Sequence, residues 1–218
     1  MFIGHFGVAL AAKKFAPTVS LGTLIFAAEF LDLLWPVFLL LGWEHVRIVP
    51  GITKVSPFDF SDYPISHSLL AVVGWSMVVS ALHFAHRRNR RAGVVVGITV
   101  FSHWVLDFIT HRPDLPLWPG GPKAGLGLWN SWIGSISIEL ILFAAGLAAY
   151  CSISRLKDNA GRYGFWSFII VLLAAWISSL PAGAPPSVTA LAWGGLSMWL
   201  TVLWGWWADS HRQVIPRA

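Results

Sequence analysis

The sequence predicts an all-α integral membrane protein, and three observations support this fold class. Of its 218 residues, 56% are hydrophobic and only 11% are charged, against about 25% charged in an average soluble protein. The mean hydropathy is +0.66. Apolar runs of about 20 residues, the length that crosses a bilayer as a helix, recur along the chain. A soluble domain of this length would not bury so much apolar surface.

Six apolar runs are long enough to cross the membrane, and together they predict one polytopic domain over residues 1–218. They cover residues 18–42, 65–85, 92–110, 131–153, 164–181 and 187–208. Residues 1–12 are apolar but too short to cross, so we expect a half-helix or an interfacial helix there. Ionisable groups concentrate in residues 1–154. We expect residues 164–208 to form apolar scaffold helices.

The basic residues predict the orientation of the chain. Eleven lie on one side of the predicted spans: Lys13, Lys14, Arg87, Arg88, Arg90, Arg91, Arg155, Lys157, Arg162, Arg212 and Arg217. Four lie on the other: Arg47, Lys54, Arg112 and Lys123. Because basic loops stay in the cytoplasm, we expect both termini there and the protein in a bacterial inner (plasma) membrane. The net charge of +5 then reflects topology, and it indicates no nucleic-acid partner.

The stretch from residue 101 to 119 carries the most unusual pattern. His103, Asp107 and His111 follow one another at intervals of four residues, so on a helix their side chains share one face. Except for Thr110, the residues between them are apolar. An ionisable group inside a membrane helix is costly and is by default a candidate for function.

Four other segments offer ionisable groups at middle or outer depth in this topology. They carry His5, the pair Glu29 and Asp32, His67, and Glu139. His5, Asp32, His67, His103 and Asp107 supply imidazole nitrogens and carboxylate oxygens, which are ligands suited to zinc and similar divalent metals. The same groups are also suited to a structural network that holds helices together. The single cysteine, Cys151, excludes a thiolate cluster within the chain.

Four short motifs, in order over the first half of the chain, resemble those of the YdjM-like family, described as membrane-bound metal-dependent hydrolases. They are Gly4-His5, the acidic turn ending at Asp32 before Pro36, His67-Ser68, and Ser102-His103-x-x-x-Asp107-x-x-Thr110 leading into Pro116-Leu117-Trp118-Pro119. The family is thought to be distantly similar to zinc-dependent phospholipase C and related nucleases, which bind a cluster of zinc ions. The acidic turn departs from the family's Pro-Asp-x-Asp. His111 follows the family's threonine position and is a candidate substitute ligand.

The resemblance implies metal-assisted hydrolysis of a phosphoester or ester in a lipid-linked or amphiphilic substrate. Asp32, His67, His103 and Asp107 are the expected ligands, with His5 next. Divalent ions would lower the pKa of water and polarise the phosphoryl or acyl oxygen. Glu29 or Glu139 is the expected general base. His111, Asp59, Asp62 and Asp114 are expected at the outer mouth, and an amphiphile would enter from the outer leaflet.

Two other functions fit the same residues. A proton- or ion-coupled transporter would use the carboxylates and histidines as a relay, but that relay must reach the inner surface. The predicted charged set stops near the middle of the membrane, which disfavours transport. A non-catalytic membrane scaffold would use the polar cluster only to fix helix packing.

Overall fold

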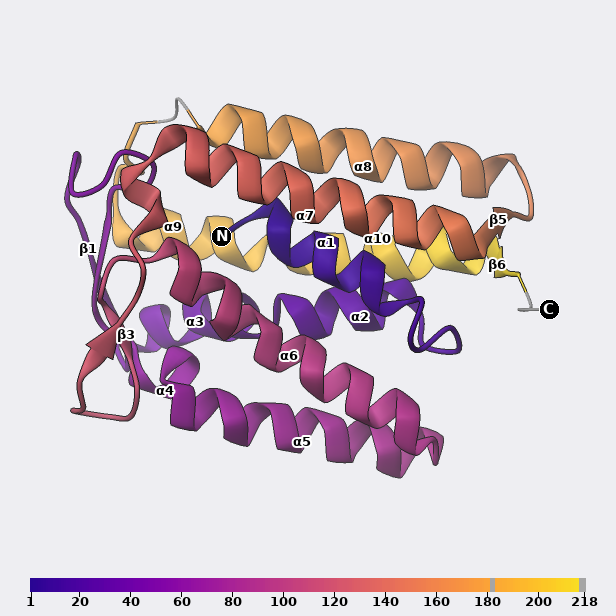
Figure 1. Ribbon diagram of the computed structural model, residues 1–218. Helices are drawn as coiled ribbons and strands as arrows, with labels where there is room; N and C mark the ends of the chain where they lie inside the picture. The colour runs from indigo at the N-terminus through magenta and orange to yellow at the C-terminus, as the bar shows by residue number, and fades with distance from the viewer. Residues whose placement is uncertain (181–182, 216–218) are drawn as a thin grey trace.

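The computed structural model describes residues 1–180 and 183–215. Its helices are α1 (Ile3–Ala12), α2 (Leu21–Ala28), α3 (Phe30–Leu41), α4 (Pro64–His67), α5 (Leu69–Arg87), α6 (Arg90–Thr110), α7 (Trp132–Ile153), α8 (Asn159–Ser179), α9 (Val188–Leu196) and α10 (Trp199–Ser210), with a 3₁₀ turn at Leu128–Asn130. Its strands are β1 (His45–Ile48), β2 (Phe58–Asp62), β3 (Leu115–Pro116), β4 (Lys123–Ala124), β5 (Ser154–Leu156) and β6 (Arg212–Val214). The long helices lie roughly side by side (Figure 1), as an all-α membrane protein requires.

The predicted spans correspond to helices of the structure. Four are the single helices α5, α6, α7 and α8, and a fifth is α9 followed by α10. The first predicted span is α2 and α3, which are bent by 55° at Glu29. The fifth predicted span, 164–181, begins five residues too late, because the Asp158 side chain accepts a hydrogen bond from the Gly161 amide and caps α8 at its true start. Its predicted last residue lies outside the described residues.

Helix α1 is a half-helix inside the bundle, in contact with α2, α6 and α7. Its approach to α7 depends on two glycines. A Cβ added to Gly146 of α7 would lie 2.0 Å from the carbonyl oxygen of Gly7, and one added to Gly7 would lie 2.5 Å from the carbonyl oxygen of Leu142. Only residues without a side chain allow the two backbones to come this close. This packing carries His5 into the interior.

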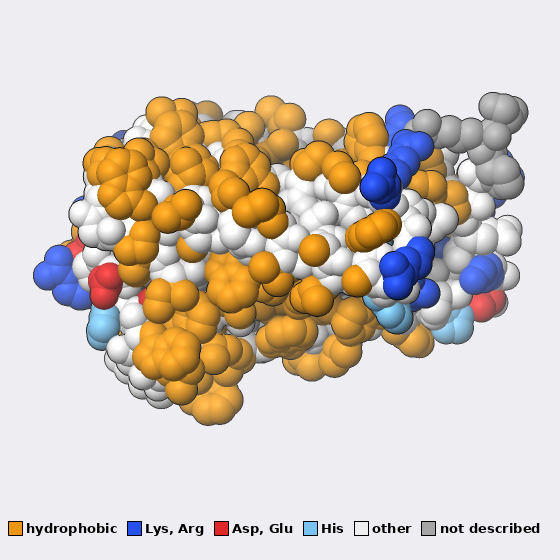
Figure 2. Space-filling view, turned by 90° about the horizontal axis from the view of Figure 1, so that it is seen from below, with side chains coloured by type: hydrophobic (Ala, Val, Ile, Leu, Met, Phe, Trp, Pro, Cys, Tyr) orange, Lys and Arg blue, Asp and Glu red, His pale blue; other side chains and the backbone are white. Residues whose placement is uncertain are grey.

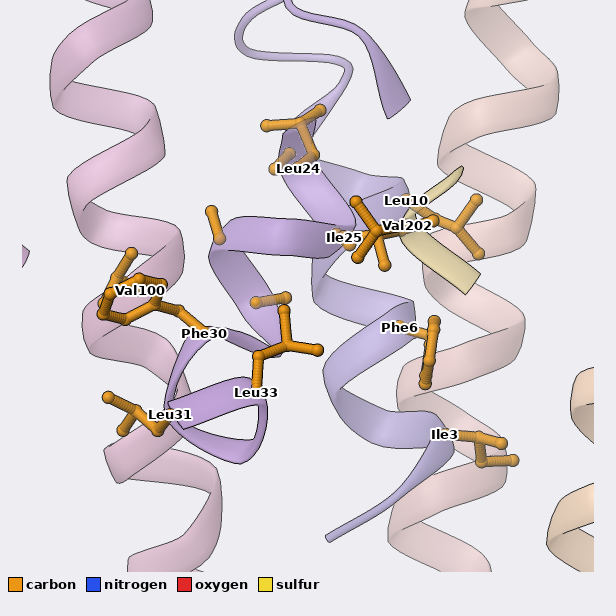
Figure 3. Close-up of a cluster of buried hydrophobic side chains, with 14 of the residues drawn as sticks. Ile3, Phe6, Leu10, Leu24, Ile25, Phe30, Leu31, Leu33, Val100 and Val202 are labelled. Atoms are coloured by element: carbon orange, nitrogen blue, oxygen red, sulfur yellow. The ribbon is translucent and has the colours of Figure 1, made fainter. Parts of the chain in front are cut away.

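The apolar core lies where α1, α2, α3, α6 and α10 meet. Figure 3 shows side chains from these helices turned toward one another, among them Phe6, Leu24, Leu31, Val100 and Val202. The outer surface is also apolar. Leu70, Met77 and Leu82 of α5 are each more than 60% exposed, and apolar side chains cover the middle of the face in Figure 2. Such a belt indicates contact with lipid.

The turns with the basic residues gather at one end of the molecule. In Figure 1 the loop after α1, the α5–α6 turn, the α7–α8 turn and β6 all lie at the right-hand end. The described residues of the predicted cytoplasmic set lie there, and Arg217 is outside the described residues. Met1 lies at the other end of α1, inside the bundle, so the predicted cytoplasmic position of the N-terminus concerns the Lys13 end of α1. That this end faces the cytoplasm stays a prediction.

The opposite end is covered by two short hairpins. Strand β1 pairs with β2, and β3 pairs with β4, both antiparallel. Asp59 on β2 forms ion pairs with Arg47 and Arg112, which ties the first hairpin to the segment after α6. Phe58 and Phe60 of the first hairpin also line a cavity inside the bundle.

Candidate metal centre

Three of the other four predicted metal ligands, together with His111, lie around the carboxylate of Asp107. His5 Nε2 lies 3.2 Å from one carboxylate oxygen of Asp107, and His103 Nε2 lies 3.1 Å from the other. His67 Nε2 and His111 Nε2 each lie 3.9 Å from Asp107. Helices α1, α4 and α6 therefore bring four imidazoles to one carboxylate.

Asp32 of α3 closes the cluster from another direction. One of its carboxylate oxygens lies 3.5 Å from His67 Nε2 and 3.8 Å from His103 Nε2. The predicted five-residue set of His5, Asp32, His67, His103 and Asp107 is thus assembled from four helices. Glu29, Glu139 and His111 lie at its edges.

The orientation of His103 is fixed by the bend between α2 and α3. His103 Nδ1 lies 2.7 Å from the carbonyl oxygen of Ala28, the last residue of α2. Because a carbonyl only accepts, Nδ1 carries the proton. In the neutral ring Nε2 is then an unprotonated nitrogen, and it points at the two carboxylates.

His67 is held by a chain of two further side chains. The Ser66 hydroxyl donates to Glu44 at 2.6 Å, so it accepts from His67 Nδ1 at 2.7 Å. Glu44 also accepts from the backbone amides of Ile65 and Ser66 at the start of α4. Glu44 is only 1% exposed. Glu44 therefore holds both helix α4 and the imidazole ring of His67 in place.

His111 is held in the same way by a carboxylate. His111 Nδ1 lies 3.0 Å from Asp114, and the Tyr63 hydroxyl donates to the same carboxylate oxygen at 3.3 Å. Burial and the neighbouring Asp114 raise the pKa of Tyr63 above its ordinary value, so its hydroxyl stays a donor. Arg112 binds the other oxygen of Asp114. His111 Nε2 therefore also faces the cluster unprotonated when the ring is neutral.

His5 differs from the other three histidines. Its ring stacks on that of His103, with centroids 3.8 Å apart and planes 5° apart. Its Nδ1 is buried without a hydrogen-bond partner among the described residues. The Met1 amine lies 2.8 Å from Asp107 and supplies positive charge next to His5.

The donor set is suited to a divalent metal. Two triads, His5–Asp32–His103 and His67–His103–Asp107, have ligand atoms that all lie within 4.8 Å of one another. Neutral nitrogens and carboxylate oxygens at about 2.0–2.2 Å from a shared ion are typical of zinc sites. His103 Nε2 is buried and has no hydrogen-bond partner in the described residues, although buried polar atoms are normally satisfied. A metal would satisfy it.

The two candidate bases occupy different places. Glu139 of α7 lines the cavity that reaches the cluster and accepts from the amides of Phe2 and Gly4 at the start of α1. Glu29 lies at the α2–α3 bend and is not among the cavity-lining residues. It is 1% exposed and neither of its carboxylate oxygens has a hydrogen-bond partner in the described part of the chain. The geometry favours Glu139 over Glu29 for contact with a substrate.

Three supporting residues are not among the predicted ligands. Glu44 and Ser66 hold His67, and Asp114, which the sequence predicts at the outer mouth, orients His111. Asp62 pairs with His45 inside the first hairpin, and Asp59 pairs with Arg47 of that hairpin and with Arg112 after α6. Two signals were available: Ser66 directly precedes His67, and Asp114 follows His111 by three residues.

Comparison with known proteins gives one match. The profile of the family described as YdjM inner membrane protein matches residues 2–211 of this chain. No curated protein matches the chain, and no solved structure does.

Proposed function

The chain belongs to the YdjM inner membrane protein family, and from this premise and the geometry of the cluster we propose that it is a metal-dependent hydrolase. Its substrate would be a phosphoester or ester in a lipid-linked or amphiphilic molecule of the membrane. The cofactor would be a divalent metal, with zinc the best chemical fit to imidazole and carboxylate ligands.

One observation carries the proposal. His67, His103 and His111 each have Nδ1 held by an acceptor, and each directs Nε2 at Asp107. Metal-binding histidines almost always donate their other ring N–H to a carboxylate, a carbonyl or another acceptor, which fixes the ring for the metal. In the neutral rings these three nitrogens carry no proton that could be donated to the carboxylates they face. A cation between them resolves this arrangement.

We assign the roles from the contacts. Asp32, His67, His103 and Asp107 would hold the metal, with His5 and His111 beside them. A bound divalent ion supplies Lewis-acid chemistry, lowering the pKa of water and polarising the phosphoryl or acyl oxygen. Glu139 would take the proton of the attacking water and return it to the leaving oxygen as the bond to that oxygen breaks. Its carboxylate is already positioned by two backbone amides.

The orientation of the chain completes the proposal. With the basic turns in the cytoplasm, the cluster lies toward the outer face, below the two hairpins. Both the Lys13 end of α1 and the C-terminal strand would face the cytoplasm. An amphiphile would then reach the cluster from the outer leaflet.

Metal analysis tests the proposal most directly. Protein purified without chelators should contain zinc or another divalent metal in stoichiometric amount, and His103→Ala and Asp107→Asn should lose it. His86→Ala is the matched control, because His86 lies in the last turn of α5, away from the cluster. Metal-free wild-type protein that takes up no zinc would refute the assignment. Hydrolysis of p-nitrophenyl phosphate and acyl esters should require the bound metal.

The main alternative is the structural cluster, and the Met1 amine beside Asp107 favours it, since an ammonium offsets carboxylate charge without a metal. It predicts that His103→Ala lowers thermal stability while wild type contains no metal. The same metal analysis therefore separates the two functions.

A further inference from the structure

A cavity of about 520 Å³ extends from the candidate metal centre into the helix bundle. Asp32, His67, Asp107, His111 and Glu139 line its polar end. Its volume falls within the range of about 300–1,000 Å³ that small-molecule sites occupy. The cavity is therefore large enough to hold more than the group to be hydrolysed.

The rest of the cavity is mostly apolar, and part of its wall comes from segments predicted to be only a scaffold. One part of this wall, here called the chain chamber, is lined by Pro36 of α3, Trp176 of α8, Leu180 after α8, Leu191 and Gly194 of α9, and Met198 before α10. No Lys or Arg lines the cavity in the part of the chain that the structure describes. A wall of this kind is suited to hydrocarbon and not to a polar or anionic group.

The chamber opens at the apolar surface of the bundle. Among its lining residues, Gly183, Ala190 and Gly194 are exposed, and the neighbouring Trp193 is 63% exposed. Figure 1 shows the start of α9 at the same end of the bundle as the hairpins. A hydrocarbon chain that enters the chamber at this opening would come directly from the bilayer.

Trp35 lies on the same helix as Asp32, one turn further along, and lines the cavity. Its side chain is buried, with 8% of the residue exposed, and its indole N–H has no hydrogen-bond partner among the described residues. Buried indole N–H groups usually find an acceptor. An oxygen of a ligand that lies between the polar end and the chain chamber would supply it.

We infer that the chain chamber binds one hydrocarbon chain of a membrane lipid, so that the substrate's ester or phosphoester is presented to the metal centre from the side of α3 and α9. This inference rests on the proposed function, which identifies the polar end of the cavity as the place where the substrate is hydrolysed. Trp35 donates to an oxygen of the lipid's polar part. The chamber then selects chain-bearing amphiphiles over water-soluble esters.

Gly194 provides a matched test of the chamber. An added Cβ at Gly194 would meet no atom within 4 Å, and the same holds for Gly74 of α5, which is not part of the cavity lining. Gly194→Leu should therefore occupy the mouth of the chamber without disturbing the backbone. Gly74→Leu adds the same side chain to a helix elsewhere.

The experiment uses the full chain in nanodiscs that contain a phospholipid with a diazirine at the end of one acyl chain. After irradiation, labelled peptides are identified by mass spectrometry. Wild type should be labelled on α3 near Pro36 and between Leu191 and Met198. Gly194→Leu should reduce this labelling about tenfold, and Gly74→Leu should leave it unchanged. Trp35→Phe should weaken it by about three- to tenfold, the loss of one hydrogen bond.

The outcomes separate this inference from the proposed function. Two results would overturn the proposal that the chamber binds a lipid chain. One is labelling confined to the lipid-facing side chains of α5, and the other is labelling of α9 that Gly194→Leu does not change. Labelling does not depend on hydrolysis, so a labelled chamber in a protein without hydrolytic activity would uphold lipid binding and refute the hydrolase. Equal kcat/KM values for chain-bearing and chain-free esters would support the hydrolase function and refute the proposal that the chamber binds the lipid chain.

Discussion

The Nδ1 atom of His103 lies 2.7 Å from the carbonyl oxygen of Ala28, a residue 75 positions earlier in the chain. In a continuous helix that carbonyl would accept from the amide four residues on. The bend at Glu29 interrupts the helix at this point and leaves the Ala28 carbonyl facing α6. A break inside a membrane helix is tolerated where the freed backbone groups bond within the protein, and here the bond orients a candidate ligand.

The support of His67 by Glu44 predicts an effect on metal affinity. Glu44→Gln keeps an oxygen for the amides of Ile65 and Ser66 but removes the carboxylate from the Ser66–His67 chain. Zinc affinity should fall by about 10- to 100-fold, the usual effect of losing such support. Competition with a fluorescent chelator measures it.

Asp62→Asn is the control for Glu44→Gln, because Asp62 pairs with exposed His45 in the hairpin. It should leave zinc affinity unchanged. Equal affinities for wild type and Glu44→Gln would show that the Glu44–Ser66 chain does not orient a ligand.

The two candidate bases predict different kinetics. Glu139→Gln should lower kcat for hydrolysis by about 10²- to 10⁴-fold while the metal content stays that of wild type. Glutamine still accepts from the Phe2 and Gly4 amides, so α1 should keep its position. Glu29→Gln should have a much smaller effect on kcat, since Glu29 does not line the cavity. A larger decrease in kcat for Glu29→Gln than for Glu139→Gln would assign the general base to Glu29.

Removal of the metal predicts a loss of stability. A ligand that binds only the folded state stabilises it by about 2.7 kcal/mol at a hundred times its Kd. Treatment with a chelator should therefore lower the Tm of wild type in detergent, and added zinc should restore it. His103→Ala should show the same Tm with and without chelator. A wild-type Tm that does not respond to chelator or zinc would contradict a metal at this cluster.

The contact of α1 with α7 predicts a packing defect. In Gly146→Ala, the added Cβ would overlap the Gly7 carbonyl, so one helix must shift. Overpacking of this kind costs about 1–3 kcal/mol. Thermal unfolding in detergent should show a lower Tm, and Gly74→Ala, where nothing lies within 4 Å, should not. Unchanged stability of Gly146→Ala would mean that α1 is held less closely than the structure indicates.

Displacement of α1 should also change the candidate metal centre, because His5 lies on α1. Gly146→Ala is therefore expected to weaken zinc binding as well, whereas Gly74→Ala should not. Zinc titration of the two variants compares them. A destabilised Gly146→Ala protein with wild-type zinc affinity would remove His5 from the ligand set.

The sequence by itself determined the membrane class, the positions of the spans and the grouping of the basic turns. These are local properties: the length of an apolar run and the charge of a loop are visible without knowing what packs against them. The common face of His103 and Asp107 is equally local, because helical periodicity alone sets it.

Only the tertiary structure decided which groups meet. Ala28 and Glu44 act on histidines through contacts that no local pattern encodes, and the bend at Glu29 matters because α6 lies beside it. Helices α8 and α9 carry no ionisable residue between residues 165 and 196, so no local pattern in them indicates a site. They line the cavity because helix packing leaves space between them and α3, and such space belongs to the assembled bundle and not to any one segment.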